Sequence, residues 1–480
     1  MSAAAQLAAV VSAAGLVVLL LAQDRWQRLA GLCAWGAGLG VLGIYLLPDL
    51  NTSRLVAGAI GGLVAAFVFA WALDRWPYLL AFATLACIPL RIPVDIGSDT
   101  VNLLLPLYAV IGGLALALAW SLVKGDTRSR ELGPVALPLA AFVGWTGLSM
   151  LWTGDVRRGA IFLAAFVLPF GLVATALLYA LVGGYQWFTR DVFWNPSVKV
   201  FNAYAPFFRV NSVFWDPSVY GRYLTVAVLA SLAGILLGGV RGWRVAGLYA
   251  VVVATWLGLL ISFSQSSFVA LSAGIVAAAS VVWGRRALVA LIALGLVTCV
   301  VLFAVPQLRD DLVGKSRSGV NRVTSGRANL VGQGIRIALD HPVIGVGVGG
   351  FSREYAHRRG ITGKDPKRVA SHTTPVTVAA EGGIVGLALL VWLVVAAFLA
   401  TLLGLGKGFT SRVALATGIV LLAIAVHSLF YAAFFEDPMT WALLGLVGLS
   451  SRVPKKPPSP QSTTAPPPAP PVPEPASTTL

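Results

Sequence analysis

Residues 371–402 read SHTTPVTVAAEGGIVGLALLVWLVVAAFLATL, an apolar run that opens with a histidine, two threonines and a proline. From residue 376 onward the run is long enough to cross the ~30 Å hydrocarbon layer as an α-helix. His372 stands directly ahead of Thr374-Pro375, a sequence typical of a helix start. The stretch therefore predicts a transmembrane helix that holds His372 at the membrane surface.

The rest of the chain is just as apolar, with 58% hydrophobic and 11% charged residues and a mean hydropathy of +0.83. Soluble globular proteins carry about twice that charged fraction. The composition predicts an all-α polytopic membrane protein with about 12–14 transmembrane helices. The candidate spans are residues 4–22, 29–47, 55–73, 77–91, 101–123, 134–151, 159–182, 223–240, 245–262, 266–284, 287–305, 376–402, 413–433 and 438–451.

The distribution of basic residues predicts the topology. Arg452, Lys455 and Lys456 follow the last apolar run, which places the C-terminus in the cytoplasm by the positive-inside rule. The same rule gives about thirteen full spans with an external N-terminus, provided that 159–182 re-enters without crossing. Residues 1–452 then form one transmembrane domain with external segments 185–222 and 306–375. The proline-rich residues 453–480 are predicted to be a disordered cytoplasmic tail.

The external segment 306–375 carries twelve Lys/Arg, five Asp/Glu and three of the four histidines. The excess of basic residues, within a chain of net charge +16, indicates anionic partners such as membrane lipid headgroups rather than nucleic acid. We expect this segment to contain short interfacial helices, one of them at 326–340. Arg327 would lie beside the free amides of its first turn, a favourable anion site. Arg336 and Asp340, four residues apart, are expected to pair.

Several glycine, acidic and histidine residues in the C-terminal half allow either a structural or a functional interpretation. The glycines of GVGVGG, residues 345–350, predict a sharp turn and a close backbone approach, since nothing around them fits a dinucleotide site. Glu381 would be an intramembrane carboxylate, either functional or paired with an arginine, and Glu436-Asp437 is a weaker case. We expect His341 and His357 in loops and His427 buried in the bundle.

Segment 185–222 combines many aromatic residues with arginines, among them Arg209 and Arg222. Aromatic residues at this density are typical of an interfacial belt. Together with guanidinium groups they also suit sugar rings and phosphates, and both interpretations stay open.

These stretches resemble the signature of the O-antigen ligase and O-unit polymerase superfamily. The resemblance lies in Gly326-Arg327, the Pro-x-x-Gly-x-Gly turn at 342–347, and His372 ahead of Glu-Gly-Gly-x-x-Gly at 381–386. RVNSVFWDPSVYGRYL at 209–224 is similar to the family's external arginine segment, and DVRRG at 155–159 to another of its landmarks.

The resemblance implies a glycosyltransferase of the bacterial cytoplasmic (inner) membrane. It would move a glycan from undecaprenyl-pyrophosphate to an acceptor hydroxyl on the external face, the acceptor being a glycan, lipid or protein. Its site residues would be His372 as general base, Arg209, Arg327 and Arg222 on the pyrophosphate, and Glu381, Gln265 and Arg336 in support. No cofactor or metal is expected. Gln265 departs from the family pattern, which commonly has arginine there.

Two alternatives remain from the sequence. One is a polyprenyl-phosphate sugar transferase whose base is an acidic residue in an early external loop, such as Asp49, Asp95 or Asp99. The other is an exporter of lipid-linked glycans, in which the basic segment only gathers anionic substrate.

Overall fold

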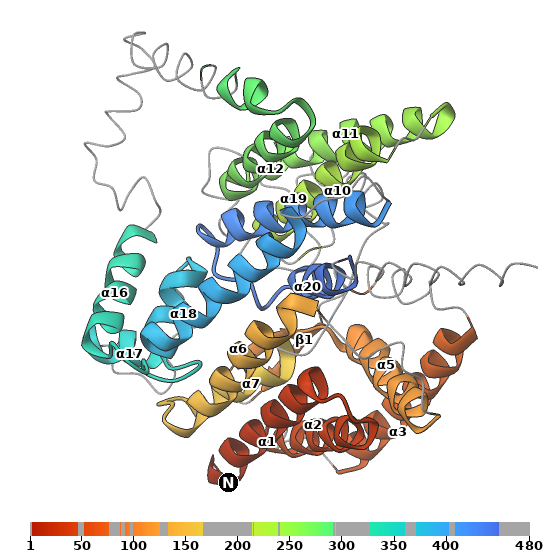
Figure 1. Ribbon diagram of the computed structural model, residues 1–480. Helices are drawn as coiled ribbons and strands as arrows, with labels where there is room; N and C mark the ends of the chain where they lie inside the picture. Colours follow the sequence, from red (N-terminus) through yellow and green to blue (C-terminus); the bar gives the residue numbers. More distant parts are fainter. Residues whose placement is uncertain are drawn as a thin grey trace, which may run out of the picture.

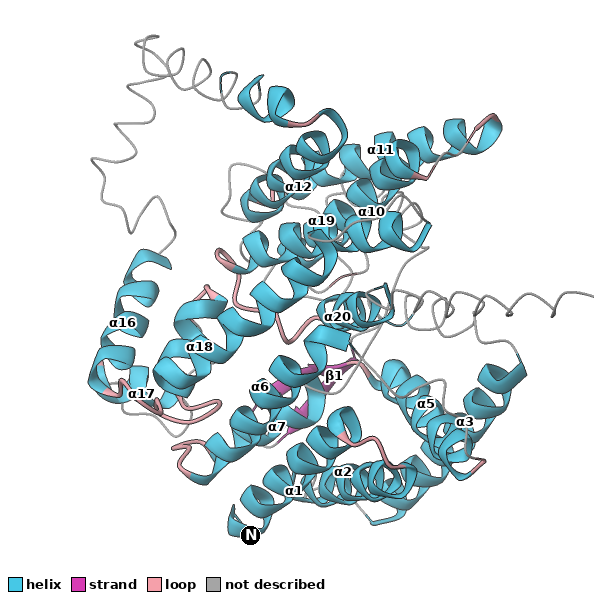
Figure 2. Ribbon diagram, in the orientation of Figure 1, coloured by secondary structure: helices cyan, strands magenta, loops and turns pink. Residues whose placement is uncertain are grey.

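The computed structural model describes residues 2–46, 52–75, 87, 92–96, 99–124, 133–166, 214, 216–238, 241–290, 293, 327–360, 371–402 and 409–450. Helices make up most of this part of the chain (Figures 1 and 2). They are α1 Ser2–Leu21, α2 Arg25–Leu46, α3 Thr52–Arg75, α5 Leu105–Val123, α6 Ala136–Leu148, α7 Val156–Phe166, α10 Pro217–Leu237, α11 Trp243–Ser262, α12 Gln265–Trp283, α16 Arg327–Asp340, α17 Phe351–Arg358, α18 Thr374–Leu402, α19 Phe409–Ser428 and α20 Pro438–Ser450. Two short 3-10 turns, η1 Gly133–Val135 and η2 Ser149–Leu151, flank α6.

Seven of the described helices are long and apolar enough to cross a membrane: α1, α2, α10, α11, α12, α18 and, from Ser411, α19. Shorter apolar helices lie within α3, α5, α6 with η2, and α20. The predicted all-α polytopic membrane fold is thereby confirmed. The count of 12–14 spans stays a prediction, because 77–91, 159–182 and 287–305 lie largely outside the described residues.

One predicted span starts later than expected. The first three residues of the predicted span 101–123 belong instead to strand β2 Asp99–Leu103, which pairs antiparallel with β1 Ile92–Ile96 (Figure 2). Ile92, Val94 and Val101 are β-branched residues that favour strands. The helix α5 therefore begins only at Leu105, with Pro106 in its first turn, where the missing amide costs nothing.

Close backbone contacts build the N-terminal half of the bundle. A Cβ atom at Gly15 would meet the Trp35 amide nitrogen at 2.5 Å, and one at Gly38 would meet the Ala8 carbonyl oxygen at 2.5 Å. Small residues of this kind let membrane helices approach closely enough for extensive van der Waals contact. From this pair, packing continues in space through α6, α18 and α19 to α10 and α12 (Figure 1).

The backbone of α18 is interrupted in its first half. Gly383 has φ 66° and ψ −163°, so the predicted span 376–402 is two helical segments rather than one. The turn after α16 docks into this break through backbone hydrogen bonds. The amides of Val346 and Gly347 donate to the carbonyls of Ala380 and Glu381, and the Ile384 amide donates to Pro342 O, at 2.8–3.0 Å. The bonds satisfy backbone groups that would otherwise be unpaired inside the protein.

The glycine turn makes this docking possible. Gly345, Gly347 and Gly349 all have positive φ, at 66°, 86° and 76°. A side chain at Gly345 would overlap the Glu381 backbone, and one at Gly347 would overlap Thr153. The expectation that these glycines permit a sharp turn and a close approach is confirmed.

Gly383→Ala should destabilise the folded protein more than Gly360→Ala. Both glycines have positive φ, which costs alanine about 1 kcal/mol. Gly360 faces open space, whereas a Cβ at Gly383 would overlap the Val343 carbonyl, and overpacking adds about 1–3 kcal/mol. Thermal unfolding in detergent checks the order, with Gly445→Ala as a control. Equal losses of thermal stability in Gly360→Ala and Gly383→Ala would show that the docked turn moves to accommodate the added methyl group without loss of stability.

Candidate active site

His372 lies two residues before the start of α18, in an unusual backbone conformation. Its φ is +62°, in the left-handed region that residues other than glycine rarely adopt, and its side chain is half-buried. Backbone strain of this kind persists only where neighbouring contacts hold it, and it clusters at functional sites. No described residue hydrogen-bonds the imidazole, which leaves its nitrogens available to a ligand.

Ser371 holds the strained turn. Its hydroxyl donates to the Thr373 carbonyl at 2.8 Å and accepts from the Thr373 amide at 3.2 Å. The same oxygen lies 2.7 Å from the Thr377 hydroxyl, one turn into α18. Ser371 is fully buried, so these bonds form away from competing water. One buried hydroxyl thus ties both sides of His372 to the helix that follows.

Arg327 begins α16, as expected from the sequence. Its half-buried guanidinium pairs with no described carboxylate, whereas Arg158, Arg222 and Arg358 each form an ion pair. An unpaired guanidinium at a helix start, beside amides that lack helical partners, is suited to binding phosphate. The structure therefore gives Arg327 the surroundings of an anion ligand.

Burial lowers the pKa of His372 below its ordinary value of 6.5, and the positive charge of Arg327 lowers it further. The carboxylate of Asp216 acts in the opposite direction. Asp216 caps α10, its Oδ1 accepting from the Ser218 amide at 2.7 Å. Groups at the starts of α10 and α16 thus act electrostatically on the histidine that precedes α18. The lowered pKa favours the neutral imidazole, which is able to accept a proton.

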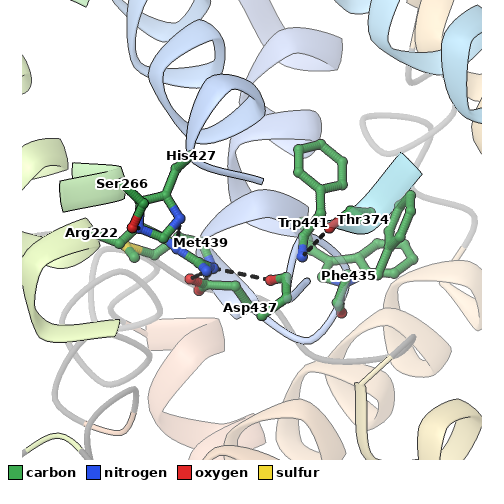
Figure 3. A network of polar contacts seen from close by, with 10 residues as sticks. Arg222, Ser266, Thr374, His427, Phe435, Asp437, Met439 and Trp441 are labelled. Atoms are coloured by element: carbon green, nitrogen blue, oxygen red, sulfur yellow. Dashed lines mark hydrogen bonds and ion pairs between the residues drawn. The ribbon is translucent and has the colours of Figure 1, made fainter. Parts of the chain in front are cut away.

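Arg222 lies deeper in the bundle, in the polar network that Figure 3 shows. Its Nη1 donates to Asp437 Oδ2 at 2.6 Å and to the Ala433 carbonyl at 3.0 Å, and its Nε donates to His427 Nδ1 at 3.3 Å. The side chain is only 2% exposed, and its Nη2 has no described partner. Contacts within the protein therefore use most of the hydrogen-bond donors of Arg222.

His427 links this network to α12. Because Arg222 donates to Nδ1, the ring proton must sit on Nε2, which lies 3.0 Å from Ser266 Oγ. Ser266 belongs to a cluster of buried hydroxyls with Ser264 and Ser267 at the start of α12. The expected burial of His427 is confirmed, and Asp437 does pair with an arginine.

The remaining predicted residues have mixed outcomes. Arg209 and Asp49 lie outside the described residues. Arg336 and Gln265 are exposed at helix positions and contact no described site residue. The expected Arg336 pair is wrong, since Asp340 instead bonds Arg358 of α17 at 2.6 Å. His357 is not in a loop but within α17, while His341 is exposed in the turn after α16.

Glu381 lies at the break in α18. One carboxylate oxygen accepts from the Phe351 amide at the start of α17, at 3.3 Å, where a helix N-terminus favours negative charge. Glu381 also lines a cavity of about 70 Å³ together with Trp145, Phe435 and Glu436. Thr374, two residues after His372, lies on the wall of the same cavity. Aromatic and carboxylate groups therefore face a hollow close to the start of α18.

Sequence reasoning missed two supporting residues, Ser371 and Asp216. Ser371 directly precedes the histidine, and Asp216 stands ahead of Pro217-Ser218, a recognisable helix start. The sequence shows that Asp216 can cap a helix. It does not show that Asp216 lies near His372, because 156 positions separate the two residues in the chain.

The fold defines a polytopic membrane protein in which Arg327, at the start of α16, acts electrostatically on His372, just ahead of α18. Residues 249–391 match the family model described as O-Antigen ligase. The match confirms the resemblance to the O-antigen ligase and O-unit polymerase superfamily, over a stretch that includes Arg327, His372 and Glu381. It supports a membrane enzyme of the ligase or polymerase type. The chain matches none of the curated proteins with which it was compared.

Asp437→Ala should destabilise the protein by about 3–5 kcal/mol, because it leaves Arg222 buried without its counter-ion. Asp340→Ala removes a carboxylate that is 61% exposed and should cost at most about 1 kcal/mol. Chemical unfolding in mixed micelles would measure both. A loss at Asp437 no larger than at Asp340 would show that water reaches the Arg222 network.

Proposed function

We propose that this protein transfers a glycan from undecaprenyl-pyrophosphate to an acceptor hydroxyl on the external face of the bacterial cytoplasmic membrane. The observation that carries the proposal is the strained, half-buried His372 in the field of the unpaired Arg327. Both residues lie within the stretch that matches the family model. The polytopic fold suits a donor whose long apolar tail stays in the bilayer.

In the proposed reaction Arg327 binds the pyrophosphate of the donor, together with Arg209 from segment 185–222. Their charges stabilise the negative charge that grows on the pyrophosphate as the bond from the anomeric carbon to oxygen breaks. The leaving group departs with that electron pair as undecaprenyl-pyrophosphate. The reaction needs no metal or cofactor in this scheme, because guanidinium groups supply the positive charge.

His372 acts as general base in the same step. Its neutral imidazole accepts the proton of the acceptor hydroxyl while the hydroxyl oxygen forms the new bond to the anomeric carbon. Ser371 keeps the ring in place by holding the backbone turn. A cation beside the histidine keeps it unprotonated before the acceptor arrives, and so the two groups have complementary roles.

Arg222, first expected on the pyrophosphate, has a different role in this proposal. Its ion pair with Asp437 and its bond to His427 join α10, α19 and the start of α20. We assign it to holding the start of α10, and hence Asp216, at the site. Glu381 supports the site from the break in α18, whereas Gln265 and Arg336 would act only through contacts outside the described residues.

The chain's activity as a ligase or as a polymerase can be read from the intermediate that accumulates in cells lacking it. Single lipid-linked units would indicate a polymerase, and full-length lipid-linked polymer would indicate a ligase. An exporter would leave lipid-linked glycan on the cytoplasmic face in either case. An acidic base at Asp95 or Asp99, on the β1–β2 hairpin, would instead leave transfer intact when His372 is replaced.

His372→Ala should lower transfer in proteoliposomes by roughly 10²–10⁴-fold, the usual contribution of a positioned general base. His341→Ala is the matched control, since His341 lies exposed beyond α16 and should leave transfer unchanged. Transfer is measured as the release of polyprenyl-pyrophosphate after donor and acceptor are added. Unchanged transfer by the His372→Ala variant would contradict the mechanism.

The pH dependence should report the charge of Arg327. The neutral imidazole is the active form, so transfer falls as pH drops through the His372 pKa, which lies below 6.5. Arg327→Gln removes a cause of that lowering, raises the pKa and moves the acidic limb to higher pH. Arg327→Lys keeps the charge and should keep the limb in place. The transfer rate is measured against pH and normalised to the maximum of each variant, which separates the shift in the His372 pKa from weakened donor binding. An acidic limb at the same pH in Arg327→Gln and Arg327→Lys would contradict the prediction.

A further inference from the structure

A groove opens at the end of the bundle opposite His372, between the last turns of α10, the start of α19 and the end of α20. Its volume is about 290 Å³. Ala230, Ala233 and Gly234 line one wall, Ala416 another, and Leu443 and Leu446 a third. The helices α10 and α19 are in contact, and the small residues of the lining leave space between them. Because nearly all the lining residues are apolar, an apolar occupant of the groove would gain packing contacts.

Arg412 stands among the residues that line the groove and is exposed. Its Nη1 donates to the Leu237 carbonyl at 3.0 Å, in the last turn of α10, where a cation offsets the helix dipole. No other described residue bonds its guanidinium, which carries five N–H donors in all. The bond fixes the side chain at the groove while donors remain for an anion.

This end of the bundle lies at the cytoplasmic surface by the positive-inside rule. Two other stretches that this rule places on the same side carry exposed tryptophans next to cations: Lys124 lies 4.8 Å from the Trp120 ring, and Arg244 lies 5.9 Å from the ring of Trp243. Tryptophan and basic residues together are typical of the headgroup region. A ligand in the groove would therefore have its polar end among lipid headgroups.

The charge around the groove is of one sign. The sequence contains no Asp or Glu between residues 217 and 309, 382 and 435, or 438 and 473. Those stretches include all three helices that line the groove. A phosphate at Arg412 would meet no carboxylate from these helices, and a cationic headgroup would find no counter-ion among them.

We propose that this groove binds an anionic phospholipid of the cytoplasmic leaflet. One acyl chain lies between α10 and α19 against their small residues, and the phosphate accepts hydrogen bonds from Arg412. The site is about one membrane thickness from His372, since the 21-residue α10 connects the two ends. It binds a lipid of the surrounding membrane, independently of the proposed glycan transfer.

Photoactivatable phosphatidylglycerol, with a diazirine in its acyl chain, tests the proposal in nanodiscs of dioleoylphosphatidylcholine holding the full chain. Labelled peptides are identified by mass spectrometry, with the matching photoactivatable phosphatidylcholine as the neutral probe. We expect phosphatidylglycerol to label peptides of α10 and α19 several-fold more than phosphatidylcholine. Arg412→Gln should reduce that labelling by roughly fivefold, the usual weight of one basic residue at a membrane surface.

Two matched pairs of variants separate a built site from general attraction. Arg244→Gln removes the same charge at the same level but outside the groove, and it should leave labelling unchanged. Ala416→Leu narrows the groove and should lower labelling, whereas Ala416→Ser should keep it. Thermal unfolding shows that each variant is folded.

Three outcomes would overturn the proposal. Equal labelling by both probes would show an acyl pocket without headgroup selection. Equal loss in Arg244→Gln and Arg412→Gln would show a diffuse surface effect. A rise in labelling on removing residues 458–480 would show that the chain's own tail occupies the groove; unchanged labelling supports a lipid.

Discussion

Hydrogen bonds between the backbone of the glycine turn and the break in α18 hold the end of α16 and the first half of α18 together. The turn follows α16, whose first residue is Arg327, and the break lies three turns into the helix that His372 precedes. Docking one into the other therefore fixes how the anion-binding residue and the histidine lie relative to each other. A membrane protein tolerates an interrupted helix only where protein groups replace the missing backbone bonds, and here the turn supplies them.

Two arginines that look alike in the sequence have different surroundings. Arg222 and Arg327 both stand in basic stretches that the sequence predicts to be external, and both are expected from the sequence to bind pyrophosphate. Arg222 is almost completely buried, and Asp437 neutralises its charge. Arg327 has no described counter-ion, and its charge acts on His372 instead. The number of basic residues in a segment therefore overstates how many can bind an anion, since a buried counter-ion removes some of them.

Local rules predicted the parts of the structure that depend on neighbouring residues. Apolar run length identified the long helices, the interfacial helix expected at 326–340 corresponds to α16, and glycine spacing identified the turn. Contacts between distant segments were not readable. A Gly-Gly pair at 382–383 fits a continuous helix as well as a broken one, and only Val343, forty residues away, decides between them. The same holds for the pairing of Asp340 with Arg358 and of Arg222 with Asp437.

The left-handed backbone at His372 lowers the stability of the protein at the position where the imidazole is proposed to act as general base. A side chain other than glycine or asparagine in that conformation costs on the order of 1–2 kcal/mol. Glycine or asparagine at position 372 would release this strain while removing the imidazole. The variant without the proposed base should then be more stable than the unchanged protein. It should also be the better form in which to trap an unreacted donor for structure determination.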